Sequence, residues 1–148
     1  MSEIDIGDVY DDLQEAWETL LEPHGVKVFS GPPGQDETGE KFVHFGDAEQ
    51  VIDQETSGDA RDETWKVDGE IVITSVSWQG GTETGIRAAR NQATSILNIL
   101  RGHVAEEYAD GSYPDVEFTG GALVQSFDKR GRQCGRRFEL TITFPKNP

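Results

Sequence analysis

The stretch of the chain most suggestive of chemistry is a glycine-rich loop, Gly80–Gly85, which follows a β-branched run and opens a helical pattern. Helix N-termini bind phosphates because their free N–H groups and the helix dipole favour negative charge. The loop has the glycine spacing of neither a dinucleotide fingerprint nor a P-loop. Glu83 would also repel a phosphate. We therefore interpret the loop as a glycine turn with a threonine helix cap, and we expect no cofactor.

Side chains that ligate metals are scattered along the sequence. The three histidines and Cys134 share no ligand spacing, whereas a zinc site needs about four such ligands. The aspartates between residues 5 and 12 lack the order of a calcium loop, and they are typical of a solvated helix start. Pro114-Asp-Val-Glu117 is similar to the opening of a nuclease motif, but Thr119 stands where its lysine would be. We therefore expect no bound metal.

Cys134 is a candidate nucleophile because Arg132 and Arg136 flank it and would favour its thiolate. No residue near it in the sequence is placed to act as a general base, and the chain contains no Gly-x-Ser-x-Gly motif. A thiol packed inside a strand is the better interpretation. We therefore predict no catalytic residues and a protein that is not an enzyme.

The charge of the chain is distributed unevenly. Residues 1–63 hold 18 acidic and 3 basic residues, whereas residues 64–148 hold 10 of each, so the net charge of −15 resides in the first part. This argues against general nucleic-acid binding, which needs a basic face. No apolar run approaches the roughly 18 residues that a membrane span needs, and the N-terminus lacks the features of a secretory signal. We expect a protein made in the cytoplasm, with no membrane contact.

Basic residues gather near one predicted hairpin. Five of the 13 bases lie within nine residues, and these are Lys129, Arg130, Arg132, Arg136 and Arg137. Such a cluster can be a solvated surface, or it can fix the register of a contact with the acidic part of a neighbouring subunit. A third possibility is contact with DNA phosphates. We favour a role in an oligomer interface.

Helical periodicity predicts two helices. The first covers residues 8–22, with Asp8 as its N-cap and Gly25 just beyond its end. The second, at about 84–108, is the longest element and contains Gly102, which costs about 1 kcal/mol relative to alanine.

Alternating and β-branched runs predict the strands. They lie at 26–29, 42–45, 70–78, 116–118, 122–127 and 138–144, with Gly120-Gly121 as a bulge between two of them. Residues 47–64 are polar, and we expect an exposed acidic loop there.

The element order α-β-β-β-α-β-β indicates one α+β domain, 1–148, with a mostly antiparallel sheet and both helices packed on it. The predicted core contains large apolar residues from the helices and the inner strands. These are Trp17, Leu20, Ile73, Leu97, Leu100, Phe138 and Ile142.

Several different sequence patterns follow one another along nearly the whole chain. They are Val26-Lys-Val-Phe-Ser-Gly-Pro-Pro33, Phe45-Gly-Asp47, the strand 71–78 leading to Arg87-Ala-Ala-Arg90, and Gly135-Arg-Arg-Phe138 leading to Leu140-Thr-Ile-Thr-Phe144. In order and spacing they resemble the tail terminator, or tail completion, proteins of long-tailed non-contractile phages and related viruses. The acidity of residues 1–63 is not part of that pattern.

The resemblance implies a structural virion protein with no catalytic residues. Members of that family form rings, typically hexamers, which cap the tail tube, end its polymerisation and offer a surface to the head connector. We therefore expect a hexameric homo-oligomer at the head-proximal end of a virion tail, assembled in the host cytoplasm. Its expected partners are the major tail tube protein and a head–tail connector or stopper protein, and DNA would only pass through the lumen.

Two alternatives stay open on the sequence. The chain could be another head–tail joining component, such as a stopper or a minor tail protein. It could also be a small cytoplasmic ligand-binding domain, although the sequence offers no converging polar pocket.

Overall fold

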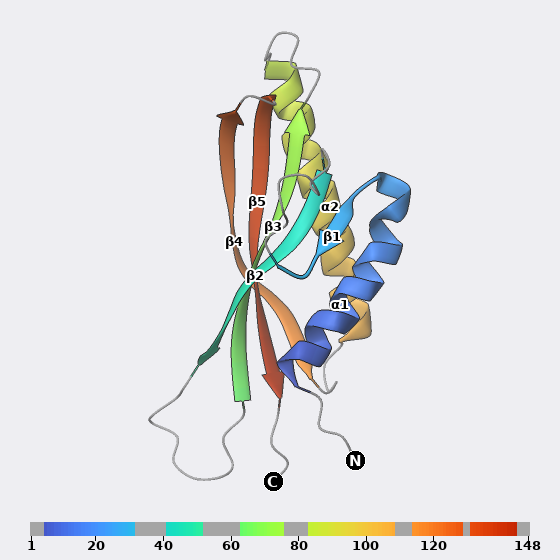
Figure 1. Ribbon diagram of the computed structural model, residues 1–148, viewed down its shortest axis with the longest axis vertical. Coiled ribbons are helices and arrows are strands. Elements are labelled where there is room, and N and C mark those ends of the chain that lie inside the picture. Colours follow the sequence, from blue (N-terminus) through green and yellow to red (C-terminus); the bar gives the residue numbers. More distant parts are fainter. Residues whose placement is uncertain are drawn as a thin grey trace.

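The computed structural model describes residues 5–31, 41–51, 63–75, 83–108, 114–128 and 131–144. The elements are α1 (Ile6–Leu21), the 3-10 turn η1 (Glu22–His24), β1 (Lys27–Phe29), β2 (Lys41–Val51), β3 (Glu63–Ser75), α2 (Glu83–Glu107), β4 (Asp115–Asp128) and β5 (Gly131–Phe144). The five strands form one twisted sheet, and both helices lie on the same side of it (Figure 1). The α+β fold and the element order α-β-β-β-α-β-β are confirmed.

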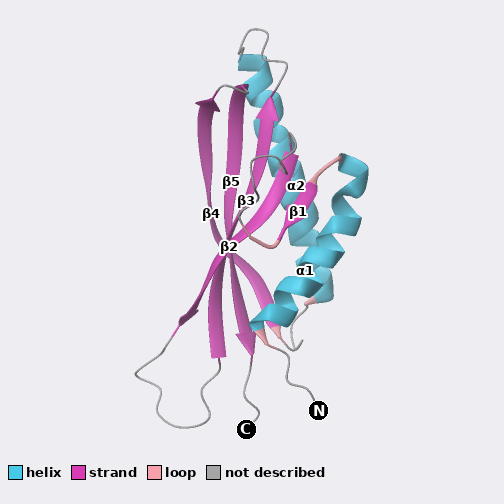
Figure 2. Ribbon diagram, viewed as in Figure 1, coloured by secondary structure: helices cyan, strands magenta, loops and turns pink. Residues whose placement is uncertain are grey.

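The strand order is β1-β2-β3-β5-β4 (Figure 2). β1 pairs with β2 in parallel, and each of the other three pairs is antiparallel, so the sheet is mixed rather than purely antiparallel. β5, the last strand in the chain, lies between β3 and β4. The chain therefore crosses from β3 through α2 to β4, two positions away in the sheet. β5 then folds back and occupies the position between β3 and β4.

Alternation along β5 separates two faces of the sheet. The side chains of Phe138, Leu140, Ile142 and Phe144 are buried on the face that the helices cover, as predicted from their spacing. Glu139, Thr141 and Thr143, between them, lie on the opposite face, which we call the outer face. Apolar burial is therefore concentrated on one side of the sheet.

The start of α1 differs from the prediction. Asp5, not Asp8, is the N-cap, and Asp8 is the third helical residue, whose carboxylate accepts a hydrogen bond from the Asp5 backbone N–H at 2.9 Å. The Asp5 carboxylate accepts one from the Asp8 N–H at 2.9 Å, which completes a capping box. Sequence pattern could not choose between two aspartates three residues apart, because each suits a cap. The end was predicted correctly, since Gly25 adopts a left-handed φ of 69°.

The predicted acidic loop at 47–64 is wrong at both of its ends. β2 continues through residues 47–51, and β3 already begins at Glu63, so the two strands pair from Ala48↔Val67 to Val51↔Thr64. A bulge between Phe45 and Ala48 shifts the register, which hid the alternation in the sequence. Residues 52–62 of the predicted loop, and residues 76–78 of the predicted central strand, lie outside the described residues.

The two predicted strands at 116–118 and 122–127 are one strand, β4, and its bulge lies directly before the predicted position, because Gly120 and Gly121 both pair with β5. The register against β5 shifts between Phe118 and Gly120. α2 begins within one residue of its predicted start and contains Gly102 at an exposed position. Within the described residues, no helix has the length and apolar character that a membrane span requires.

The core centres on Trp17, whose side chain is fully buried. Its rings stack on Phe45 at 5.1 Å between centroids and meet Phe138 edge-on at 5.9 Å. Six of the seven predicted core residues are buried, but Leu20 is 37% exposed and is an error of the prediction. The apolar stripe of α1 is narrow because the helix packs through Val9, Leu13, Trp17 and Leu21, which leaves Leu20 at its margin.

Substitution by alanine should have opposite effects on the free energy of unfolding at two glycines. Gly69 lies opposite Phe138 in the sheet, and a Cβ atom there would overlap the Phe138 ring. We expect Gly69→Ala to lower the free energy of unfolding by about 1–3 kcal/mol through overpacking. Gly102→Ala is the control, because a Cβ there meets nothing within 4 Å and should stabilise the helix by about 1 kcal/mol. Urea unfolding measures both, and destabilisation by Gly102→Ala would contradict this account.

The hydrogen-bonded contact between α1 and α2 should make the stability of the protein depend on pH. The Trp17 Nε1–H donates a hydrogen bond to His103 Nδ1 at 3.1 Å, and burial lowers the pKa of His103 against the opposing effect of Glu107 and Glu106. A group with a lowered pKa binds protons more weakly in the folded state, so its contribution to stability is lost as the pH falls below about 6.5.

We therefore expect His103→Gln, which keeps an acceptor but does not titrate, to reduce the loss of thermal stability between pH 7.5 and pH 5.5. His24→Gln, at an exposed position of η1, is the control and should leave that loss unchanged. An identical pH dependence in the His103→Gln variant and the parent would contradict the assignment.

Candidate functional site

The predicted basic hairpin joins β4 to β5. Lys129 and Arg130 lie outside the described residues, and Arg132 is placed only by its backbone, which pairs with Ser75 and Phe127. Arg136 and Arg137 are consecutive residues of β5, so their side chains leave opposite faces of the sheet. The two arginines therefore serve different surfaces.

Arg136 lies on the helix side of the sheet, beside Cys134 on the same strand. Its Nε is buried and has no hydrogen-bond partner within the described part of the chain. Burial raises the pKa of the Cys134 thiol, although Arg90 and Arg136 act to lower it. The prediction of a packed thiol is confirmed, because the Cys134 residue is only 1% exposed.

Arg137 lies on the outer face and joins a row of polar side chains across three strands. Its Nε is 3.5 Å from Glu70 Oε2, and the other carboxylate oxygen of Glu70 lies 3.5 Å from His44 Nε2. The Arg137 side chain is 63% exposed, whereas those of Glu70 and His44 are 23% and 22% exposed. The row thus runs from a half-covered histidine to a solvent-facing guanidinium.

Glu70 is the centre of this row. The hydrogen bond from His44 lowers the pKa of Glu70 most, Arg137 lowers it further, and burial opposes both. Gly135, across the β3–β5 pair, makes space for the carboxylate, because a Cβ atom there would meet Glu70 Oε2 at 2.5 Å. The site therefore holds an ionised carboxylate between two nitrogen-bearing side chains.

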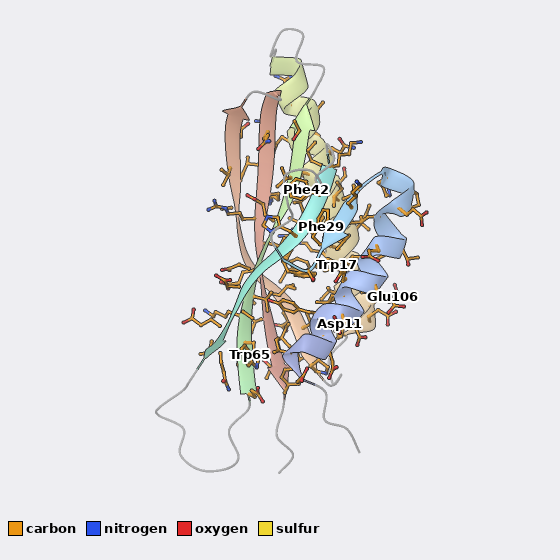
Figure 3. The ribbon with its side chains drawn as sticks, viewed as in Figure 1. Asp11, Trp17, Phe29, Phe42, Trp65 and Glu106 are labelled. Atoms are coloured by element: carbon orange, nitrogen blue, oxygen red, sulfur yellow. The ribbon has the colours of Figure 1, made fainter. Side chains whose placement is uncertain are left out.

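Aromatic side chains adjoin the row on β1 and β2. The His44 ring lies 5.8 Å from the Phe42 ring, and Phe42 meets Phe29 edge-on at 6.1 Å. Figure 3 labels Phe29 and Phe42 on the two neighbouring strands. His44 Nδ1 is buried here and has no hydrogen-bond partner in the described residues. The outer face thus combines an apolar strip with an ionic row, which is a composition typical of contact surfaces.

The other residues considered for chemistry do not converge. His24 lies in η1, His44 on the outer face and His103 between the helices, and no group of three or more metal-ligating side chains occurs among the described residues. Asp5 and Asp8 cap α1. The loop at 80–82 lies outside the described ranges. The structure therefore draws attention to the outer-face row instead.

Sequence reasoning missed His44 and Glu70 as members of a site. Each is the polar member of an alternating strand, in Val43-His44-Phe45 and Gly69-Glu70-Ile71, so both could have been assigned to the outer face. Their proximity depends on the register His44↔Glu70↔Arg137 across β2, β3 and β5. Strand neighbours of that kind are not visible in one sequence.

Comparison with known proteins assigns neither a family nor a function to this chain. No protein-family model and no curated protein matches this chain. The function of the chain is therefore inferred from its geometry and its sequence patterns.

The lowered pKa of Glu70 predicts a pH-dependent contribution to stability. A carboxyl group with a lowered folded-state pKa stabilises the protein above its ordinary value of 4.5, and this stabilisation is lost as the pH falls through the folded-state pKa. We expect Glu70→Gln to cost about 1 kcal/mol at pH 7 and less at pH 3.

Unfolding in urea at the two pH values measures the difference. Glu49→Gln, an exposed outer-face residue opposite Lys66, is the control and should cost less than Glu70→Gln at pH 7. Equal costs for the two variants would contradict the role given to the Glu70 row.

Proposed function

We propose that this chain is a structural virion protein that forms a ring at the end of a tail tube, ends the polymerisation of the tube and joins it to the head connector. The observation that carries the proposal is the order of the elements. The patterns that resemble tail terminator proteins fall on β1, the bulge of β2, the end of β3, the first turns of α2, and β5. A virion tail would then be the location of the protein.

The distribution of charge supports assembly in a ring. Exposed acidic residues lie on the solvent-facing side of α1 and at the start of η1, and they are Asp11, Asp12, Glu15, Glu18 and Glu22. Arg137 is exposed on the outer face, whereas α1 packs on the opposite face of the sheet. A contact between these surfaces joins unlike faces of two copies, which is a head-to-tail contact, and such contacts form a ring when the rotation between subunits closes. Complementary charge would fix the register of the subunits.

The experiment adds the purified full chain to the polymerising tail tube protein of the same virus, with electron microscopy as the readout. We expect a ring at one end of each tube and shorter tubes than without the chain. Arg137→Ala should fold but cap few tubes, because it removes the exposed guanidinium of the proposed contact. Lys66→Ala, which also removes an exposed base from the outer face, is the control and should cap normally.

Thermal unfolding checks that both variants fold. Tubes that keep growing without rings in the presence of the folded parent chain would overturn the proposed function. Normal capping by Arg137→Ala would remove Arg137 from the subunit contact and leave the ring itself to be explained by other surfaces.

A further inference from the structure

The second feature that suggests a partner is the free edge of the sheet at β4. β4 is the outermost strand, has 14 residues, and pairs only with β5 among the described strands. One side of its backbone therefore carries N–H and C=O groups that no described strand satisfies. Long edges of this kind accept further strands.

A groove runs beside the first part of this edge. It has a volume of about 630 Å³ and lies between the C-terminal half of α2 and the start of β4, which Figure 1 draws next to each other. Its walls are Arg101, Val104 and Ala105 from α2, Tyr108 directly after α2, and residues 115–118 from β4. The Arg101 guanidinium lies 6.0 Å from the centre of the Phe118 ring.

We propose that this edge and groove bind an extended peptide of a partner protein, which adds to the sheet as a strand beside residues 115–118. A groove between a helix and an edge strand supports that mode of recognition, in which backbone hydrogen bonds give affinity and alternate side chains give specificity. The bulge between Phe118 and Gly120 shifts the register of β4, and so separates residues 115–118, beside the groove, from residues 120–128.

The two faces of β4 specify the side chains of the peptide. Val116 and Phe118 face the helix side, where they pair with Ile142 and Leu140, so the added strand would place apolar side chains in the groove there. Asp115 and Glu117 face the outer side, where they pair with Thr143 and Thr141. Opposite charges on neighbouring strands attract. The peptide is therefore expected to alternate apolar and basic residues.

This inference does not depend on the proposed ring. A strand-binding edge would serve a virion component that grips an extended arm of its partner, and it would equally serve an adaptor with no viral role. Failure of the tube-capping experiment would leave the present test unaffected, because the test uses the chain alone with synthetic peptides.

The probe is an acetylated and amidated hexapeptide of alternating lysine and valine, labelled with a fluorophore. We expect it to bind the full chain more tightly than the matching glutamate–valine peptide, and to slow amide hydrogen exchange in residues 115–118. The same lysine–valine peptide with every backbone nitrogen methylated has no backbone N–H to donate to β4, and its affinity should fall. Equal affinity of the methylated and unmethylated peptides would overturn strand addition.

Charge reversal separates the groove from general attraction to an acidic protein. Asp115→Lys with Glu117→Lys should weaken lysine–valine binding by about tenfold and turn the preference toward the glutamate–valine peptide. Asp11→Lys with Glu15→Lys changes the net charge equally on the exposed side of α1, and it should keep the parent's preference. Equal losses in the two variants would overturn the proposal. The methylated probe tests it on the unmodified chain even if a variant fails to fold.

Discussion

The arrangement of the molecule depends on the burial of Trp17 against the sheet. The indole stacks between α1 and an aromatic group made of Phe45, Phe118 and Phe138, with centroid distances from 5.1 to 6.5 Å. Each such pair contributes about 0.5–1.5 kcal/mol beyond the burial of area. The Phe138 ring can occupy the space beside Gly69 of β3 only because that residue has no side chain. One tryptophan therefore sets the distance of α1 from the sheet and, through its hydrogen bond to His103, the position of α1 beside α2.

Packing both helices on one face has a consequence for the other face. The outer face keeps partly covered polar groups that must satisfy one another, and the His44–Glu70–Arg137 row does so across three strands. A carboxylate as covered as Glu70 is tolerated because two nitrogen-bearing side chains offset its desolvation. The same layering separates the acidic surface of α1 from Arg137. The two charged surfaces can meet only between different molecules.

Among the described strands, the edge of the sheet is the other place where backbone groups have no partner. β1 has three residues, whereas β4 has 14, so the two edges offer very different lengths of backbone. β4 is at the edge because β5 folds back between it and β3. Its charged outer residues and apolar inner residues then present an alternating pattern beside a groove. The position of β5 between β3 and β4 therefore determines both the outer-face row and the groove.

The sequence by itself determined the local structure, because capping residues, glycine positions and apolar spacing act over a few residues. It predicted the α+β class, the element order and the buried face of β5, and it placed the bulge of β4 at Gly120-Gly121, directly after its actual position. It failed at residues 47–51, where a bulge breaks the alternation, and at Leu20, where helix packing decides burial. Only the tertiary structure decided that β1 pairs in parallel, that β5 lies between β3 and β4, and that Arg136 and Arg137 serve opposite faces. Strand register depends on contacts between distant residues, and these brought His44, Glu70 and Arg137 together.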